Sequence, residues 1–168
     1  MITVLFACVH NAGRSQIAAA LFNKYADSSK ARAISAGTQP APRVHPEVVE
    51  AMRARGIELS SETPRQLTPE LAATAQWLVT MGCGDECPVV PGTRRDDWPI
   101  QDPKGQPPGV VAGIINDIDA RVRRFIDSAI YRTDACCRKA SPSLARNSRS
   151  NSSPSQRVTL IKNRQGLL

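Results

Sequence analysis

Residues 2–15 read Ile-Thr-Val-Leu-Phe-Ala-Cys-Val-His-Asn-Ala-Gly-Arg-Ser, and this stretch decides the fold. It begins with a short apolar run, which is typical of a central strand in a parallel sheet. From Ser15 onward an apolar residue returns every third or fourth position, which predicts a helix. A tight loop that carries Cys8 and Arg14 therefore joins the strand to the helix. The loop amides and the helix N-terminus converge on one point, where a tetrahedral oxyanion could sit.

The sequence that follows alternates between strand patterns and helix patterns. Further strands are predicted at residues 31–36, 77–81 and 98–100, and residues 57–60 are expected to be extended. Further helices are expected from Pro46, Thr68 and Gly109. The last helix has an apolar stripe made of Val110, Val111, Ile114, Ile115, Ile118, Val122, Phe125 and Ile126. This alternation predicts an α/β fold with a parallel sheet that is covered on both faces.

Three reactive segments follow predicted strands. They contain Cys8, Cys83 and the loop after Ile100. Because ligands of such sheets bind at the carboxyl ends of the strands, we expect these segments to meet at one edge.

Charge is unevenly distributed along the 168 residues. Eight of the 22 Lys and Arg residues, but one of the 15 Asp and Glu residues, follow residue 131, which leaves 14 of each sign in residues 1–131. We therefore expect one neutral domain over residues 1–131 and a basic tail over residues 132–168. The tail is rich in Ser, Arg, Asn and Pro without periodicity, which indicates disorder or an altered terminus without a role. The basic excess lies outside the domain, so it does not indicate nucleic-acid binding.

Cysteine usage indicates a reducing compartment. The N-terminus has no basic leader, and no apolar run approaches the length of a membrane span, so we expect a cytoplasmic monomer with no membrane partner. The cysteines are Cys8, Cys83, Cys87, Cys136 and Cys137. In that compartment they do not predict a disulfide framework, and an odd count with one cysteine near the N-terminus favours a reactive thiol.

The loop chemistry suits a cysteine nucleophile. The helix N-terminus, inward-pointing amides and Arg14 would each favour the thiolate of Cys8. The Arg14 guanidinium can bind two oxyanion oxygens in a planar fork, and Ser15 can hydrogen-bond the thiolate or cap the helix. The alternative is that Cys8 is an inert buried thiol at the end of a strand.

The other loop residues have predicted roles around an anion. Asn11 is expected to brace the loop because asparagine tolerates left-handed backbone, and Gly13 would let the backbone approach a ligand. His10 could adjust the loop charge, but we expect a solvated histidine. The predicted oxyanion-binding residues are Val9, His10, Asn11, Ala12, Gly13 and Arg14.

Two more segments could complete a reaction site. Asp102 precedes Pro103 and could act as a general acid if a bound anion kept its carboxyl protonated; the alternative is a turn-forming Asp-Pro pair. Cys83 and Cys87 are redox candidates, because a thiol at either position could attack a Cys8 adduct and release its product. The alternative is that they are two small buried residues at the end of a strand. No metal site is predicted, because this cysteine spacing with two histidines matches no common zinc pattern.

Three motifs in order resemble the low-molecular-weight tyrosine phosphatase superfamily, and within it the arsenate reductases. Residues 8–16 resemble the active-site loop, residues 80–88 the redox loop, and residues 97–105 the acid loop. The resemblance covers about residues 1–130. It implies a flavodoxin-like three-layer sandwich with a four-stranded parallel sheet, and no metal or bound cofactor.

The resemblance also implies roles and partners. Cys8 would attack arsenate, a phosphate mimic, while Arg14 binds the oxyanion and Asp102 serves as the acid. In thioredoxin-coupled members a loop cysteine displaces arsenite and a further cysteine takes over the disulfide, usually with a longer spacing than between Cys83 and Cys87. The Met-Gly-Cys-Gly-Asp-x-Cys-Pro form resembles actinobacterial members, in which mycothiol attacks the adduct and a mycoredoxin completes the reduction.

Two alternatives stay open at this point. The first is a protein tyrosine phosphatase that uses the same residues on a phosphoester. Such phosphatases surround the substrate entrance with aromatic residues and lack the Cys83/Cys87 loop, whereas here Trp98 is the aromatic residue near the acid loop. The second is a non-catalytic module that binds an oxyanion or a partner.

Overall fold

The computed structural model of the protein describes residues 1–82 and 91–131. Along this part of the chain the elements are β1 (Ile2–Cys8), α1 (Arg14–Tyr25), β2 (Ala31–Gly37), α2 (Pro46–Arg53), α3 (Pro69–Ala73), β3 (Trp77–Met81), β4 (Arg94–Asp97), α4 (Pro108–Phe125) and a π-helical segment, η2 (Ile126–Tyr131). Segment 83–90 and the predicted basic tail lie outside the described residues.

The four strands form one parallel sheet in the order β2-β1-β3-β4. This arrangement confirms the predicted four-stranded parallel α/β fold. Cys8 pairs with Gly37 of β2 on one side and with Met81 of β3 on the other. The strand order reverses next to β1, and ligands of open α/β sheets bind at such a point. Cys8 therefore ends the central strand where a ligand is expected.

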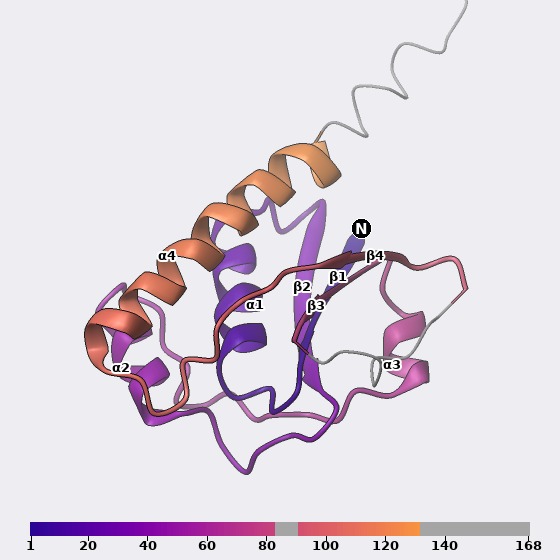
Figure 1. Cartoon of the computed structure of the whole chain (residues 1–168). Helices are drawn as coiled ribbons and strands as arrows, with labels where there is room; N and C mark the ends of the chain where they lie inside the picture. The colour runs from indigo at the N-terminus through magenta and orange to yellow at the C-terminus, as the bar shows by residue number, and fades with distance from the viewer. Residues whose placement is uncertain (83–90, 132–168) are drawn as a thin grey trace, which may run out of the picture.

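Helices cover both faces of the sheet (Figure 1). Along β1 the side chains alternate: Val4, Phe6 and Cys8 pack with α1, α2 and α4, whereas Leu5 and Ala7 pack beside α3. All of these residues are buried, because a central strand with helices on both faces has no solvent side. Each large apolar side chain that is buried in this way contributes roughly 1.5–3 kcal/mol. The apolar run at residues 2–7 thus fixes β1 at the centre of the molecule.

The predicted fourth strand at residues 98–100 is wrong. The strand is Arg94–Asp97, and all four of its residues are exposed at the edge of the sheet. An exposed edge strand needs no apolar residues, so its sequence gave no strand signal. Trp98 follows this strand and belongs to the core. It is 4% exposed, and its ring centroid lies 5.6 Å from that of Phe6.

The helices begin close to their predicted positions. Pro46 opens α2, and Thr68 caps α3 through a hydrogen bond from the Leu71 amide to its hydroxyl oxygen. The chain leaves the end of α2 through Gly56, whose φ of +73° suits glycine. Helix α4 begins at residue 108, and Val110 is 37% exposed, so the prediction that it belongs to the buried stripe is wrong. The segment 57–60 joins no strand.

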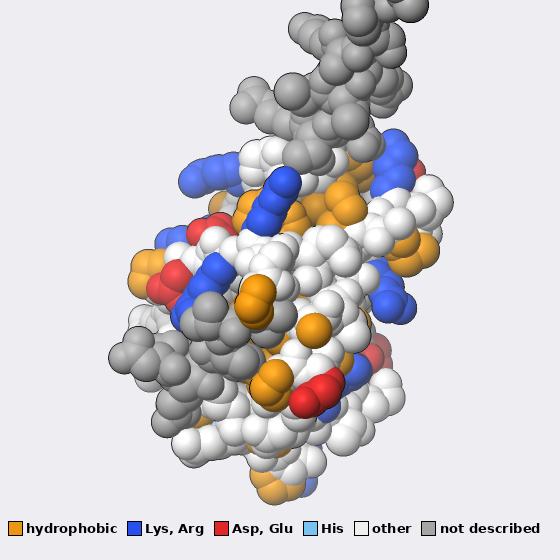
Figure 2. All heavy atoms as spheres, turned by 90° about the vertical axis from the view of Figure 1, so that its right-hand side faces the viewer, with side chains coloured by type: hydrophobic (Ala, Val, Ile, Leu, Met, Phe, Trp, Pro, Cys, Tyr) orange, Lys and Arg blue, Asp and Glu red, His pale blue; other side chains and the backbone are white. Residues whose placement is uncertain are grey.

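The surface carries charges of both signs. On the face that Figure 2 shows, the Lys and Arg side chains lie apart from one another, with acidic and apolar groups between them. Within residues 1–82 and 91–131, no helix is long and apolar enough to cross a membrane.

Candidate active site

The sulfur of Cys8 lies in a buried hydrogen-bonded chain. Cys8 is 2% exposed, and its Sγ lies 3.0 Å from Ser15 Oγ. Asn11 Nδ2 donates a hydrogen bond to the same Ser15 oxygen at 2.8 Å. Since the amide occupies an acceptor position of the hydroxyl, the single Ser15 proton is free to point at the sulfur. Of the two contacts predicted for Ser15, the structure shows the one with the sulfur of Cys8, and α1 has no side-chain cap.

Asn11 braces the loop, as predicted from its tolerance of left-handed backbone. Its φ is +48°, and it is completely buried. Besides donating to Ser15, its Oδ1 accepts hydrogen bonds from Gln16 Nε2 at 3.3 Å and from the Arg65 amide at 2.9 Å. One side chain thus ties the loop to α1 and to the segment before α3.

The loop turns its carbonyl groups away from the centre of the site. The carbonyl oxygens of residues 8, 9, 10 and 12 accept hydrogen bonds, at 2.8–3.2 Å, from the amides of Thr38, Gln39, Ala41 and His45. Within the part of the chain that the structure describes, the amides of residues 9–13 donate to no protein acceptor. A loop with its carbonyls bonded outside and its amides free, at a helix N-terminus, is an anion cradle. The geometry therefore suits the predicted binding of an oxyanion by residues 9–14.

Arg14 joins the nucleophile loop to the acid loop. Its Nη2 donates to Asp102 Oδ2 at 2.7 Å, and its Nη1 donates to the Ile100 carbonyl at 3.3 Å. The sequence predicted that Arg14 and Asp102 would both face an anion but not that they form an ion pair. A Cβ added to Gly82 would lie 2.6 Å from Arg14 Nη1, and Gly82 has a φ of +73°. Gly82 thus lets the end of β3 approach the guanidinium.

The acid loop is folded tightly around Asp102. The Lys104 amide donates to Asp102 Oδ1 at 3.0 Å, so each carboxylate oxygen has a partner. Pro103 packs against the nucleophile loop at Gly13, where an added Cβ would lie 2.8 Å from the proline Cγ. Gly13 was expected to make room for a ligand, but the contact that requires glycine in this structure is with Pro103.

Two histidines lie beside the site. His10 was expected to be solvated; instead it is half-buried, and its Nδ1 is buried with no hydrogen-bond partner in the described residues. Burial lowers the pKa of His45, while the carboxylates of Glu47 and Asp102 oppose this shift. The sequence indicated no role for His45, and it precedes α2 at the point where the loop carbonyl of Ala12 is bound.

Gly37 is a further position that sequence reasoning missed. A Cβ at this residue would lie 2.5 Å from the Val9 carbonyl oxygen and 2.8 Å from the Asn11 amide nitrogen. The sequence pattern at this residue predicts no more than the end of a strand. The available signal was its position level with Cys8, since neighbouring parallel strands end at one edge. Cys83 and Cys87, the redox candidates, lie outside the described residues.

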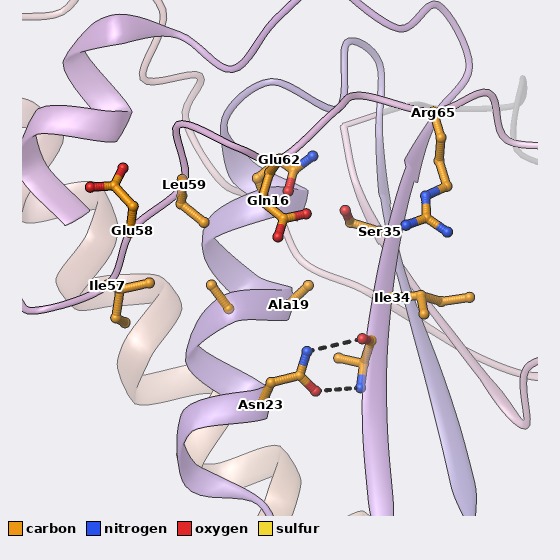
Figure 3. A pocket seen from close by; sticks show the side chains of 12 residues that line it. Gln16, Ala19, Asn23, Ile34, Ser35, Ile57, Glu58, Leu59, Glu62 and Arg65 are labelled. Atoms are coloured by element: carbon orange, nitrogen blue, oxygen red, sulfur yellow. Dashed lines mark hydrogen bonds between the residues drawn. The ribbon is translucent and has the colours of Figure 1, made fainter. Parts of the chain in front are cut away.

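A cavity of about 390 Å³ lies behind the loop, between α1, β2 and the segment 57–65 (Figure 3). Asn23, one of the residues that line it, makes two hydrogen bonds with the backbone of Ala33, at 2.7 and 3.0 Å (Figure 3). Gln16 lines this cavity and also donates a hydrogen bond to Asn11, so one side chain links the cavity to the nucleophile loop. It contains none of the predicted catalytic side chains.

Known proteins share this fold and sequence. Residues 3–135 match the family described as low molecular weight phosphotyrosine protein phosphatase. Arsenate reductase 1 of Bacillus cereus is 32% identical over 130 residues, which are 75% of this chain and 95% of that protein.

Two solved structures are similar in both sequence and fold. A thioredoxin-dependent arsenate reductase of Corynebacterium glutamicum is 43% identical with a TM-score of 0.66, and the match covers 76% of this chain and 61% of that chain. An arsenate reductase of Archaeoglobus fulgidus is 32% identical with a TM-score of 0.65, and the match covers 74% of this chain and 99% of that chain. The match over residues 3–135, the parallel sheet and the Cys8 loop agree: this chain belongs to the low molecular weight phosphotyrosine protein phosphatase family.

Proposed function

We propose that this protein is an arsenate reductase that uses the Cys8 thiolate as its nucleophile. The observation that carries the proposal is the anion cradle that follows β1, where the buried Cys8 Sγ lies 3.0 Å from Ser15 Oγ. Relatives at 32–43% identity are named arsenate reductases, which supports arsenate as the oxyanion. No resident metal or prosthetic group is needed for this chemistry.

The first half of the reaction would use residues of the two loops. The amides of residues 9–13 and the Arg14 guanidinium bind arsenate, and Cys8 Sγ attacks arsenic. A sulfur–arsenic bond forms while an arsenic–oxygen bond breaks, and the leaving oxygen takes a proton to depart as water. Asp102 lies beside Arg14 and is the candidate that donates this proton. Arsenic is still pentavalent in the resulting adduct.

The second half needs an external thiol, and two routes fit the sequence. In a relay, the thiolate of Cys83 or Cys87 attacks Cys8 Sγ, a disulfide forms, and the sulfur–arsenic electron pair leaves with arsenic as trivalent arsenite. A dithiol protein such as thioredoxin then reduces the disulfide. In the other route the mycothiol thiolate attacks arsenic and displaces the Cys8 thiolate; a mycoredoxin thiolate then attacks the mycothiol sulfur, a mixed disulfide forms, and the sulfur–arsenic electron pair leaves with arsenic as arsenite. The name of the Corynebacterium relative supports thioredoxin, whereas the short spacing from Cys83 to Cys87 supports mycothiol. Both routes need a reducing compartment, in line with the expected cytoplasmic location.

Turnover of arsenate with each reductant system supplied separately tests the proposal. The wild-type protein is expected to produce arsenite with thioredoxin and its reductase, or with mycothiol and mycoredoxin. Cys8→Ser is expected to abolish either activity. The substitutions Cys83→Ser and Cys87→Ser then separate the routes, since a relay fails without a resolving cysteine whereas transfer to mycothiol continues. Arsenite production by Cys8→Ser at the wild-type rate would refute the nucleophile assignment.

A phosphatase is the second candidate, because the family description itself favours it. The same Cys8, Arg14 and Asp102 would form and hydrolyse a phosphocysteine. Against this candidate, Trp98 is buried in the core beside Phe6 and does not supply an aromatic wall to a substrate entrance. Substantial hydrolysis of p-nitrophenyl phosphate without arsenate reduction would establish the phosphatase instead.

A further inference from the structure

The first turn of α2 contacts both loops of the candidate site. The amide of His45, the residue before this helix, donates to the Ala12 carbonyl of the nucleophile loop at 2.9 Å. Two residues later, Glu47 Oε1 accepts a hydrogen bond from the Gly105 amide of the acid loop at 2.6 Å. These contacts lie on one rigid turn, and Pro46 fixes the backbone between them. The turn therefore sets the spacing between the two loops.

Among the described residues, Glu47 is the only charged side chain that forms a hydrogen bond with Gly105 of the acid loop. Its bond to Gly105 lowers the pKa of its carboxyl, with smaller contributions from the neighbouring His45 and Lys104 charges. A carboxylate that accepts a backbone N–H forms one of the stronger protein hydrogen bonds. The contact spans 58 residues of sequence, so it is a tertiary restraint and not part of a local turn.

The acid loop transmits this restraint to Asp102. Gly105 has a φ of +69° with no atom within 4 Å of an added Cβ, so its glycine serves the turn and not a packing contact. The turn is closed by hydrogen bonds from the Gln106 amide to the Pro103 carbonyl and from the Lys104 amide to Asp102. Moving Gly105 therefore moves the loop to which the Asp102 carboxylate is bonded.

We propose that Glu47 is a positioning residue: its carboxylate holds the acid loop so that Asp102 stays beside Arg14 and the anion cradle. The inference rests on the proposed function, because it assigns Glu47 a part in delivering the Asp102 proton. Among the described residues the hydrogen bond of the Glu47 side chain is to Gly105 and not to the cradle or Cys8, so we expect it to act on the step that needs the acid and not on the binding of the anion.

Three variants on α2 test the proposal. Glu47→Ala removes the acceptor, Glu47→Gln keeps an oxygen acceptor without charge, and Glu50→Ala is the matched control from an exposed position on the same helix with no hydrogen bond to the acid loop. For Glu47→Ala we expect kcat for arsenate to fall about tenfold, because small displacements of a reacting group carry large rate penalties. KM for arsenate, and the phosphate concentration that halves Cys8 alkylation by iodoacetamide, should stay within about twofold. Glu47→Gln should recover most of the rate, and Glu50→Ala should match the wild type.

Amide hydrogen exchange gives a readout that does not depend on activity. Exchange at Gly105 should be faster in Glu47→Ala than in the wild type or in Glu50→Ala, while free energies of unfolding are compared by urea denaturation. If the wild-type protein reduces no arsenate, the proposed function fails, and Gly105 exchange alone decides whether Glu47 restrains the loop. The inference is overturned if Glu47→Ala matches Glu50→Ala in kcat or in exchange, if KM changes in place of kcat, or if Glu47→Gln is as slow as Glu47→Ala.

Discussion

Replacing Asn11 should show how much of the stability of the protein depends on its nucleophile loop. The side chain makes three hydrogen bonds, to Ser15 Oγ, Gln16 Nε2 and the Arg65 amide, at 2.8, 3.3 and 2.9 Å. At about 1 kcal/mol for each bond, their loss costs roughly 2–4 kcal/mol in Asn11→Gly, which keeps the positive φ without strain. Asn11→Ala loses the same bonds and also places a Cβ at a φ of +48°, which adds about 1–2 kcal/mol.

Urea denaturation monitored by tryptophan fluorescence measures both variants. The expected order of the free energy of unfolding is wild type, then Asn11→Gly, then Asn11→Ala, with an unchanged m-value because the folded state stays the same. Because both variants lose the same hydrogen bonds, the difference between their free energies of unfolding measures the cost of a Cβ at this positive φ. Equal stabilities for alanine and glycine, or a loss below about 1 kcal/mol in both, would refute the role assigned to this side chain.

Three further predictions concern the anion cradle and the surface. Arg14→Lys should raise the phosphate concentration that halves Cys8 alkylation at least about tenfold, because an ammonium group lacks the planar fork; an unchanged concentration would contradict the assignment. Gly82→Ala should weaken the same protection and destabilise the fold by about 1–2 kcal/mol, since it puts a Cβ 2.6 Å from Arg14 Nη1 at a φ of +73°; urea denaturation and the alkylation assay measure the two effects. The Arg53 guanidinium holds the pKa of Glu58 at about 2, below the ordinary 4.5, so the pair stabilises the folded state above pH 4.5 and its contribution is lost as the pH falls toward 2. The difference in Tm between the wild type and Arg53→Ala should therefore shrink as the pH falls from 4.5 toward 2. A difference in Tm that stays constant over this range would contradict the pairing.

The central elements of this fold could be predicted from sequence because their signals are strong and local. The apolar run before Cys8 can be buried only at the centre of a covered sheet, and Pro46 and Thr68 mark helix starts by known capping chemistry. Asn11 was expected to brace the loop for a backbone reason that the structure confirms. These predictions depend on residues within a few positions of one another.

What the sequence did not show depends on contacts between distant segments. The strand Arg94–Asp97 is polar because it lies at an exposed edge, so its pairing with β3 is visible only in three dimensions. Glu47 and Gly105 are ordinary residues for a helix and a turn, and nothing within either segment indicates that they meet. The same holds for Gly37, whose close approach to the loop follows from strand register and not from its neighbours in sequence.

The ion pair between Arg14 and Asp102 connects the two parts of the proposed mechanism, anion binding and proton donation. Arg14 directs one N–H of Nη2 to Asp102 and one N–H of Nη1 to the Ile100 carbonyl, which leaves three N–H groups of the guanidinium for an oxyanion. An arsenate in the cradle would use the remaining donors, while the ion pair keeps the Asp102 carboxyl beside the anion. One guanidinium would thereby hold both the oxyanion and the candidate acid, so that the leaving oxygen and its proton donor meet beside the same side chain.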